Sequence, residues 1–368
     1  MKKLLFCIFD LNGGGAEKVL VNLLERLDPK KYDVTLLTIF GVGVHKDRVP
    51  TWIKQRSVFS KQFKGFTTIM KLFSPKLLHR LFVGKQKYDL EIAYLETSPT
   101  RLISGAPKGT KKVAWVHVQE ETPDTFKSIY RSRSEIINAY NRFDAIACVS
   151  KFIKQSFTDN HPVITTPKKV IYNVVDLDRM LSLGKEEWTV LDESKLNIVS
   201  VGRLTKQKGY LRLLSIVNRL NMSGFKDEFQ LYILGCGEDR EKMENYIEEN
   251  DLMNVHLLGF QENPYKIVSK MDCFVCSSYK EGYSTAVNEA VKLGVPVVTT
   301  ETSGMDEILQ DGKFGMIVPN DEEKLFDALK KVIEDPKQLE KYRKEIRISN
   351  TDSTNYEMNE QFIDSFLK

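Results

Sequence analysis

Residues 273–300, with the sequence CFVCSSYKEGYSTAVNEAVKLGVPVVTT, contain the pattern that decides the fold. The stretch begins with a short apolar run that predicts a strand, and a polar loop follows it. A helix is then expected, because Ser284 is a good N-cap and Gly294 a good residue to follow a helix end. The β-branched run 295–300 predicts a second strand. Strand, loop, helix and strand make a βαβ unit, which requires a parallel sheet.

Two carboxylates lie on either side of the expected helix start, Glu281 in the loop and Glu289 inside the helix. The first helical amides, near Thr285, have no partners within the helix and therefore favour an anion such as phosphate. Ionised carboxylates only accept hydrogen bonds, so acids on both sides of a phosphate indicate a ligand that also carries hydroxyl groups. Sugar nucleotides have both kinds of group. For an isolated pair of glutamates, the alternative is two solvated acids without a chemical role.

The whole chain has 368 residues, which predicts two domains, and 42% hydrophobic with 28% charged residues is typical of a globular protein. No apolar run approaches the roughly 20 residues needed to cross a bilayer. The apolar start of the chain is too short for a signal peptide and predicts the first strand. Five cysteines, an odd number, fit a reducing cytosol. Cys273 and Cys276 are expected to pack within a strand, without a metal or redox role.

Charge is distributed unevenly along the chain. Residues 1–170 contain 29 Lys and Arg against 15 Asp and Glu, whereas the remainder contains 25 against 35. Within the first part, residues 46–87 carry eleven basic residues and the single acid Asp47, with phenylalanines and leucines between them. This segment is either the solvated helical face of an ordinary core or a basic, aromatic surface that rests on anionic lipid. Nucleic acid also satisfies the charge, but no nucleic-acid-binding motif accompanies it.

A glycine-rich turn follows the first expected strand, because residues 10–17 read DLNGGGAE and lead into a helix with one apolar face. A dinucleotide-binding fingerprint is the obvious alternative for this turn. However, Lys18 replaces its last glycine, and no acid closes the second strand near Ile39. The turn can still admit a phosphate, because glycine has no Cβ to obstruct the backbone.

Further candidates lie at the ends of expected strands, where α/β sheets bind ligands. His117 ends the strand expected at 113–118, and a lone histidine there is more often structural than chemical. Arg203 and Lys208 lie in the loop after the strand expected at 196–201. A guanidinium fork and an ammonium in one loop can neutralise a diphosphate, although a random basic pair in a loop is usually solvated.

Together these stretches resemble the retaining glycosyltransferases of the GT-B fold, in particular family 4 (glycosyl transferases group 1), of the type that builds bacterial surface polysaccharides. Three segments carry the resemblance: Gly14-Gly15-Ala16-Glu17, residues 202–209 (GRLTKQKG), and residues 281–298 with the E-x7-E pair followed by Gly294-Val295-Pro296-Val297-Val298. The resemblance covers nearly the whole chain. It implies an α/β architecture of two Rossmann-like, doubly wound parallel-sheet domains that face each other across a cleft.

The resemblance also implies a division of labour between the domains and among their residues. Residues 1–172, with a C-terminal helix at 355–368 that crosses back, would bind the acceptor, and residues 173–354 the nucleotide sugar. Arg203 and Lys208 would hold the diphosphate. Glu281 would bind the sugar hydroxyls, and His117 would lie close to the donor sugar and the acceptor. The other residues that the resemblance places in the donor site are Gly14, Gly15, Phe260, Tyr283, Ser284, Thr285 and Glu289, the last of them on the ribose.

The implied reaction is sugar transfer from a nucleotide sugar, with a UDP-sugar favoured, to a lipid-linked glycan or polysaccharide, with retention of anomeric configuration. No convincing protein nucleophile is present, which favours a front-face mechanism assisted by the leaving phosphate. The D-x-D pair that holds Mn²⁺ in the other major transferase fold is absent, so we expect neither a metal nor another cofactor. We expect a cytoplasmic protein, peripheral at the inner face of the plasma membrane, that binds no nucleic acid. A GT-B sugar-nucleotide epimerase and a non-catalytic GT-B partner subunit are the alternatives.

Overall fold

The computed structural model of the protein describes residues 1–119, 122, 127–189, 191–349 and 355–368. The chain divides into two compact units, one formed by Met1–Val175 with Thr354–Lys368 and the other by Asp176–Ser353. The division falls close to the boundary expected after residue 172, and the C-terminal segment belongs to the first unit. No helix in the described ranges is long and apolar enough to span a membrane.

The strands of the first unit form one parallel sheet, which has seven strands in the described part of the chain. They are β1 (Lys2–Ile8), β2 (Tyr32–Phe40), β3 (Lys54–Phe59), β4 (Leu90–Ala93), β5 (Lys111–Val116), β6 (Ala145–Cys148) and β7 (Lys168–Val170). The order across the sheet is β3-β2-β1-β4-β5-β6-β7, so the winding direction reverses between β1 and β4. The central strands read as continuous apolar runs because both of their faces are buried, whereas the edge strand β3 is largely exposed.

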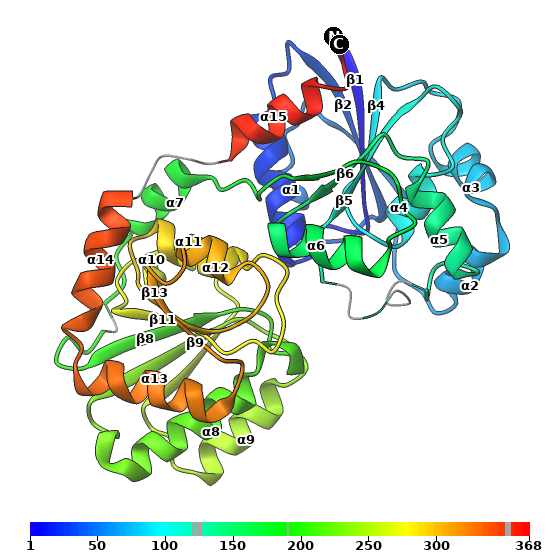
Figure 1. Cartoon of the computed structure of the whole chain (residues 1–368). Coiled ribbons are helices and arrows are strands. Elements are labelled where there is room, and N and C mark those ends of the chain that lie inside the picture. The colour runs from blue at the N-terminus through cyan, green and yellow to red at the C-terminus, as the bar shows by residue number, and fades with distance from the viewer. Residues whose placement is uncertain (120–121, 123–126, 190, 350–354) are drawn as a thin grey trace. The chain divides into compact units, whose positions relative to one another are not determined.

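Helices connect these strands and pack against the sheet (Figure 1). They are α1 (Gly15–Arg26), the short 3₁₀ turn η1 (Lys46–Arg48), α2 (Phe66–Leu72), α3 (Pro75–Phe82), α4 (Ser98–Ile103), α5 (Arg133–Tyr140), α6 (Lys151–Asn160) and α15 (Tyr356–Asp364). Helix α1 has the apolar stripe expected from the sequence, since Val19, Leu20, Leu23 and Leu24 are all buried.

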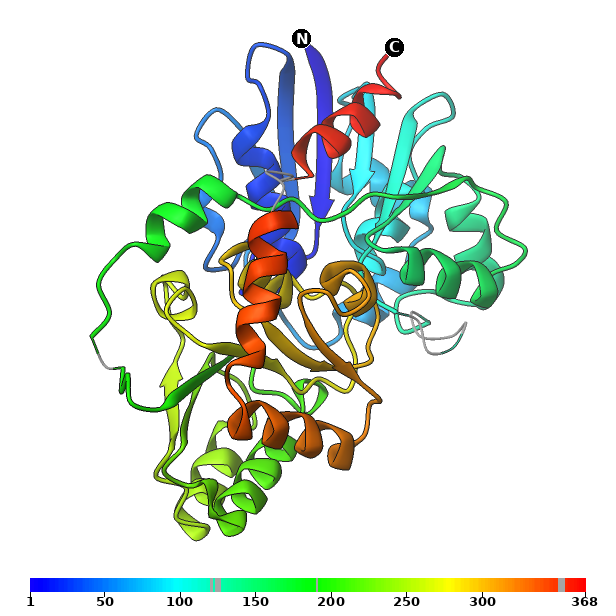
Figure 2. The ribbon, with the colours of Figure 1, turned by 60° about the vertical axis from the view of Figure 1, so that its left-hand side comes forward.

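The last helix, α15, belongs to the first unit and lies beside α1 (Figures 1 and 2). The Tyr356 hydroxyl donates to the carbonyl of Arg26 at 2.7 Å, at the end of α1. The Asn359 amide donates to the carbonyl of Tyr172 at 2.9 Å. These bonds to backbone carbonyls hold the C-terminal segment on the unit that begins the chain.

The second unit has a six-stranded parallel sheet in the described part of the chain, in the order β10-β9-β8-β11-β12-β13. Its strands are β8 (Leu196–Val201), β9 (Phe229–Leu234), β10 (Val255–Gly259), β11 (Cys273–Cys276), β12 (Val297–Thr300) and β13 (Gly315–Val318). Its helices and helical turns are α7 (Leu177–Gly184), η2 (Lys206–Lys208), α8 (Tyr210–Leu220), η3 (Asn221–Phe225), α9 (Arg240–Glu249), α10 (Tyr265–Val268), α11 (Thr285–Lys292), α12 (Met305–Leu309), α13 (Glu322–Glu334) and α14 (Gln338–Ser349).

Helices cover both faces of this second sheet (Figure 1). One core cluster joins the sheet to α8, α9 and α13 through buried side chains such as Leu213, Met243 and Leu329. A separate cluster on the other face includes Ile267 from α10 and Val287 from α11. The predicted fold class, two Rossmann-like α/β domains with parallel sheets, is therefore confirmed.

Candidate active site at the carboxyl edge of the second sheet

The loops after β8 and β11 meet at the carboxyl edge of the second sheet, where the strand order reverses and where such sheets bind ligands. The Tyr279 amide donates to the carbonyl of Gln207 at 2.8 Å, and the Ser277 hydroxyl donates to the carbonyl of Lys208 at 3.0 Å. Gly209 permits this approach, because its φ is +67° and a Cβ there would lie 2.1 Å from the Ser277 carbonyl oxygen. A larger residue would force the two loops apart.

Lys208 and Glu281, predicted from separate motifs, are in direct contact. The Lys208 Nζ lies 2.7 Å from Oε1 of Glu281, whose side chain is only 8% exposed. The Ser278 hydroxyl donates to the same oxygen at 2.6 Å. The Cys276 thiol lies 3.9 Å from that oxygen, and its pKa is raised first by burial and then by the carboxylate. Two donors thus fix one oxygen of Glu281 in position.

Arg203 begins the same loop as Lys208 and has an exposed side chain. In the described ranges its guanidinium has neither a hydrogen-bond acceptor nor an ion-pair partner. Lys208 is already paired with a carboxylate, so Arg203 is an available cation for an anion that enters this edge of the sheet.

Arg212, which the sequence reasoning did not identify, holds the loop that carries Glu281. One of its guanidinium nitrogens donates to the carbonyls of Ser277 and Ser278, and another donates to the Asn320 side chain at 2.8 Å. The guanidinium also lies 4.2 Å from the centre of the Tyr279 ring. The only signal in the sequence is a basic residue among the apolar positions of α8. Its partners are backbone carbonyls distant in sequence, and no motif reports them.

Helix α11 begins where the sequence predicts. The Ser284 hydroxyl accepts from the Val287 amide at 3.5 Å, and Gly294 follows the helix with a φ of +85°. The amides of Thr285 and Ala286 precede the first N–H···O bond within the helix and are oriented out of its N-terminus. Such amides favour an anion at this position, as expected from the sequence.

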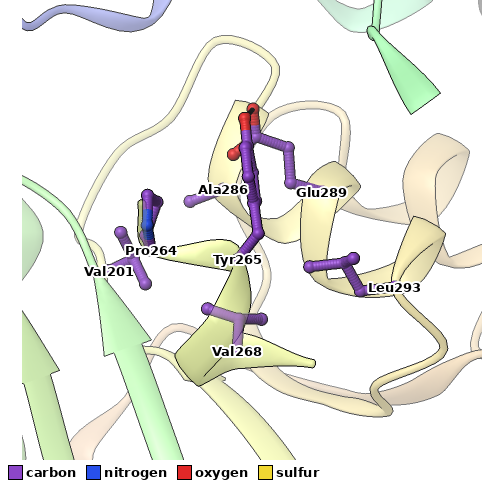
Figure 3. A pocket seen from close by; sticks show the side chains of 7 residues that line it. All are labelled: Val201, Pro264, Tyr265, Val268, Ala286, Glu289 and Leu293. Carbon is purple, nitrogen blue, oxygen red and sulfur yellow. Dashed lines mark hydrogen bonds between the residues drawn. The ribbon is translucent and has the colours of Figure 1, made fainter. Parts of the chain in front are cut away.

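Glu289 lines a shallow pocket between the end of β8 and helices α10 and α11 (Figure 3). The Tyr265 hydroxyl donates to Oε1 of Glu289 at 3.3 Å, and Figure 3 shows the tyrosine ring beside the carboxylate. The pocket is lined by Val201, Pro264, Tyr265, Val268, Ala286, Glu289 and Leu293. One carboxylate beside a mainly apolar lining suits a ligand that combines a hydroxyl group with an apolar surface.

Two other predicted residues of this unit lie at its surface or beside a neighbouring loop. Phe260 follows β10 and is 58% exposed, so its ring is available for contact with a ligand. Tyr283 is half-buried against Gly304, which has a φ of +76° and whose Cβ position lies 3.1 Å from the tyrosine ring. The structure therefore brings Lys208, Glu281 and the start of α11 together and leaves Phe260 on a separate loop.

Gly14, Gly15 and His117 belong to the first unit. Gly14 is the N-cap of α1, and a Cβ on it would meet the Glu17 carboxylate at 2.0 Å. The Glu17 side chain is flexible and can move aside, so this contact alone does not require glycine; the lack of a Cβ leaves the backbone at the helix start open to close approach.

His117 lies directly after β5 and is buried, with its ring centre 5.0 Å from that of Tyr94. Burial lowers the pKa of His117 to about 3, so the imidazole is neutral at neutral pH. Its Nε2 has no hydrogen-bond partner among the described residues. A neutral imidazole with an unused nitrogen can still accept or donate one hydrogen bond.

Many solved structures share this arrangement of two units, each with a parallel α/β sheet. The crystal structure of HepE from Anabaena, in complex with UDP and glucose, superimposes with a TM-score of 0.76 over 99% of this chain and 100% of that chain. The sequence identity is 16%, and the likeness shows the fold, which is GT-B.

Family profiles match both halves of the sequence. The profile described as Glycosyltransferase Family 4 matches residues 13–179, and the profile described as Glycosyl transferases group 1 matches residues 186–348. The chain therefore belongs to the family 4 (group 1) glycosyltransferases.

Two curated relatives illustrate the family. One is N-acetylgalactosamine-N,N'-diacetylbacillosaminyl-diphospho-undecaprenol 4-alpha-N-acetylgalactosaminyltransferase of Campylobacter jejuni, 28% identical over 357 residues, which are 93% of each chain. The other is the lipopolysaccharide core biosynthesis glycosyltransferase LpsE of Rhizobium meliloti, 25% identical over 88% of this chain and 86% of that one.

Proposed function

We propose that this protein moves a sugar from a UDP-sugar to a lipid-linked glycan or polysaccharide acceptor, with retention of anomeric configuration and without a metal. The observation that carries the proposal is the contact between Lys208 and Glu281 beside the start of α11, with Arg203 in the same loop, exposed and without a side-chain partner among the described residues. These groups combine the two chemistries that a sugar diphosphate requires, cations for the phosphates and a carboxylate for the sugar hydroxyls.

Arg203 and Lys208 would neutralise the charge that develops on the departing diphosphate, and the amides of Thr285 and Ala286 would add donors to it. When a donor binds, the Lys208 ammonium lies between a carboxylate and a phosphate, so it stabilises both. The carboxylate of Glu281, held in position through Oε1, would then accept hydrogen bonds from the sugar hydroxyls. Glu289 would accept from the ribose, with the base near Phe260.

A front-face mechanism accounts for retention better than a glycosyl-enzyme does. The Glu281 oxygen that is fixed in the structure already accepts hydrogen bonds from Lys208 and Ser278, which lowers its nucleophilicity. The leaving phosphate would instead assist attack of the acceptor from the same face of the sugar. Arg203, Lys208 and the free amides at the start of α11 would together offset the charge of the diphosphate without a divalent ion.

The comparisons support the choice of donor and acceptor. HepE was crystallised with UDP and glucose, which favours a UDP-sugar as donor. The name of the Campylobacter jejuni relative describes an acceptor on diphospho-undecaprenol, and LpsE acts in lipopolysaccharide core biosynthesis. We therefore assign this chain to the synthesis of a bacterial surface glycan, with the first unit binding the acceptor and the second the donor. Its place would be the cytoplasmic face of the plasma membrane, as a peripheral protein.

The test is a matrix of nucleotide sugars against lipid-linked acceptors, with and without EDTA. We expect thermal stabilisation by UDP over GDP and ADP, product formation with one UDP-sugar, and unchanged rates in EDTA. NMR of the product should show the anomeric configuration of the donor. Donor conversion in the absence of any acceptor would indicate an epimerase. No stabilisation by any nucleotide would indicate a non-catalytic subunit, and loss of transfer in EDTA with recovery in Mn²⁺ would refute metal independence.

A further inference from the structure

Helices α2 and α3 of the first unit present leucines to solvent. Leu72 at the end of α2 is 67% exposed, and Leu81 near the end of α3 is 57% exposed. Leu77, one turn before Leu81, and Phe73, between the two helices, are 40% and 37% exposed. Lys76 and Arg80 are exposed beside them on α3. We call these six residues the α2–α3 ridge.

The aromatic side chains of the same segment are arranged differently. The rings of Phe59 and Phe66 pack against Phe40, with centroid separations of 5.9 Å and 4.9 Å. Phe82 packs on Phe59 at 5.7 Å. Phe66 is buried and Phe59 and Phe82 are half-buried in this cluster, so these three rings do not form the exposed aromatic surface that was one of the two expectations for the segment. The exposed apolar residues of the ridge are mainly leucines.

Two arginines, Arg101 buried and Arg131 exposed, fix the end of α2. Arg101, fully buried, donates to the carbonyls of Met70 and Phe73, and its charge is paired with Glu135 at 2.7 Å. Arg131 donates to the carbonyls of residues 71 and 72, the second at 2.7 Å. The last carbonyls of a helix have no partners within it, so these guanidinium groups act as a C-terminal cap.

Helix α3 is anchored on its opposite face. His79 Nε2 lies 2.8 Å from Oε2 of Glu91 on β4, and both side chains are buried. Ser74 caps the start of the helix by accepting from the Leu77 amide at 3.3 Å. Arg56 of β3 donates to the carbonyls of residues 82 and 83 at its end. The helix cannot turn its leucines inward without breaking these contacts.

A fixed apolar ridge flanked by basic residues and without an acid on its own helices is complementary to an anionic lipid surface. The leucines would enter the apolar boundary while Lys76 and Arg80 meet the headgroups. Nucleic acid offers nothing for exposed leucines. A second copy of this chain would bring like charges together, because each copy carries the same basic residues.

We propose that the α2–α3 ridge is the element that docks this protein on an anionic membrane. The proposal rests on the proposed function, which places the acceptor in a membrane, and it specifies the surface that reaches it. It also explains the two arginine caps, since a short helix pair that inserts leucines must keep its shape outside the core.

Flotation of the full chain with phosphatidylcholine vesicles, with or without phosphatidylglycerol, tests the ridge. The variant L72S/L77S/L81S should lose at least about tenfold in partitioning onto the anionic vesicles. The variant K76E/R80E should lose about as much and should no longer distinguish the two kinds of vesicle. Matched controls in the second unit, M222S/M253S and K341E/K344E, change side chains that are also exposed, the methionines more so than the ridge leucines, and these variants should bind as the wild type does.

A probe on the ridge distinguishes insertion from loose electrostatic contact. Cys236 is the exposed cysteine and the other four are buried, so a C236S background leaves the substitution Leu72→Cys as the site of labelling. An environment-sensitive fluorophore there should shift to shorter wavelength on anionic vesicles, and one at Met222→Cys should not. A ridge probe that stays in water, or variants that bind vesicles as tightly as the wild type, would overturn the proposal.

The outcome is separable from that of the proposed function. UDP binding and transfer to a short-chain, water-soluble acceptor should be unchanged in both ridge variants, which also shows that they fold. Transfer by a wild-type protein that does not bind vesicles would refute docking by the ridge and leave the proposed transferase function standing. Vesicle binding by a wild-type protein that transfers no sugar would refute the proposed function and leave docking by the ridge standing. If the wild type is dimeric in solution and L72S/L77S/L81S is monomeric, the ridge is an interface between copies and the proposal fails.

Discussion

From the contact between Lys208 and Glu281 we predict two separate effects of its removal, one on stability and one on turnover. Replacement of Lys208 by Met removes the ammonium but keeps most of the apolar stem. Among the described residues, the Glu281 carboxylate, which is 8% exposed, then keeps the Ser278 hydroxyl at 2.6 Å and the weak Cys276 thiol as donors to its fixed oxygen. Loss of one donor leaves a buried negative charge less well compensated.

The size of the stability effect follows from the geometry. A hydrogen bond to a charged group contributes about 1.5–3 kcal/mol. The Lys208 side chain is 21% exposed, so water screens part of the interaction and the lower half of that range applies. We expect Lys208→Met to lower the free energy of unfolding of the second unit by about 2 kcal/mol. In the double variant Lys208→Met/Glu281→Gln, the loss of unfolding free energy should be about 1 kcal/mol smaller than the sum of the losses in the two single variants.

The effect on turnover should be larger than the effect on stability. A preorganised charge donor that faces a leaving group contributes about 2–4 kcal/mol to the transition state, which corresponds to a loss of roughly 30- to 1000-fold in kcat/KM. Lys206 lies in the same loop with an exposed side chain, so Lys206→Met is the matched control and should change neither quantity.

Urea unfolding of the four members of the cycle, together with steady-state kinetics and UDP affinity, measures all three effects. Stability losses that add within about 0.5 kcal/mol would show that Lys208 and Glu281 do not interact in solution. Turnover of Lys208→Met within about threefold of the wild type would exclude a role in stabilising the leaving group, because the expected loss is at least tenfold larger.

Three further predictions concern single residues. Arg203→Ala should reduce transition-state stabilisation, measured through kcat/KM, by about 2–4 kcal/mol. The melting temperature should stay unchanged, because the exposed guanidinium has no partner among the described residues. A shifted melting temperature with normal kinetics would contradict this prediction. Glu289→Gln should weaken UDP binding by about 1 kcal/mol while it changes turnover little, and Glu281→Gln should do the opposite; the reversed pattern would exchange their roles. His117 has a pKa of about 3 in the folded protein, so the unfolded state binds more protons between pH 3 and 6.5, and stability falls as pH falls through that window by up to about 1.4 kcal/mol per pH unit. The variant His117→Gln should lack this part of the pH dependence in denaturant unfolding, and parallel pH profiles would refute the assignment.

Most strands and helix α11 could be predicted because their signals, an apolar run or a capping residue, lie within the element itself. Strand β8 has the bounds expected from its apolar run at 196–201, since a strand buried on both faces contains few polar residues. Helix α11 has Ser284 at its start, and Gly294 after its end takes the left-handed conformation that glycine favours. The residues of the predicted donor loops were found because each loop carries a family motif.

Elements whose stability comes from distant contacts were not predicted. Strand β3 at the sheet edge reads KQRSVF and is mostly exposed, so hydrophobic patterning gives almost no signal for it. Its pairing with β2 through backbone hydrogen bonds is what makes it a strand. Arg101 and Arg212 are buried inside short helices and donate to carbonyls of other elements. A sequence pattern shows a basic residue at such a position but not the carbonyls that compensate its burial.

In segment 46–87 the composition does not reveal which apolar side chains are exposed. Its composition predicts either the solvated face of an ordinary core or a basic surface that the phenylalanines share. Most of the rings instead pack in a cluster around Phe40, and the most exposed apolar side chains of the segment are those of Leu72 and Leu81. Which face of α3 meets water is decided by the buried pair of His79 and Glu91, and these residues are twelve positions apart in sequence. Whether a leucine of this segment is exposed or buried therefore depends on contacts between elements that the local sequence pattern does not report, and the folded structure is needed to identify the exposed ones.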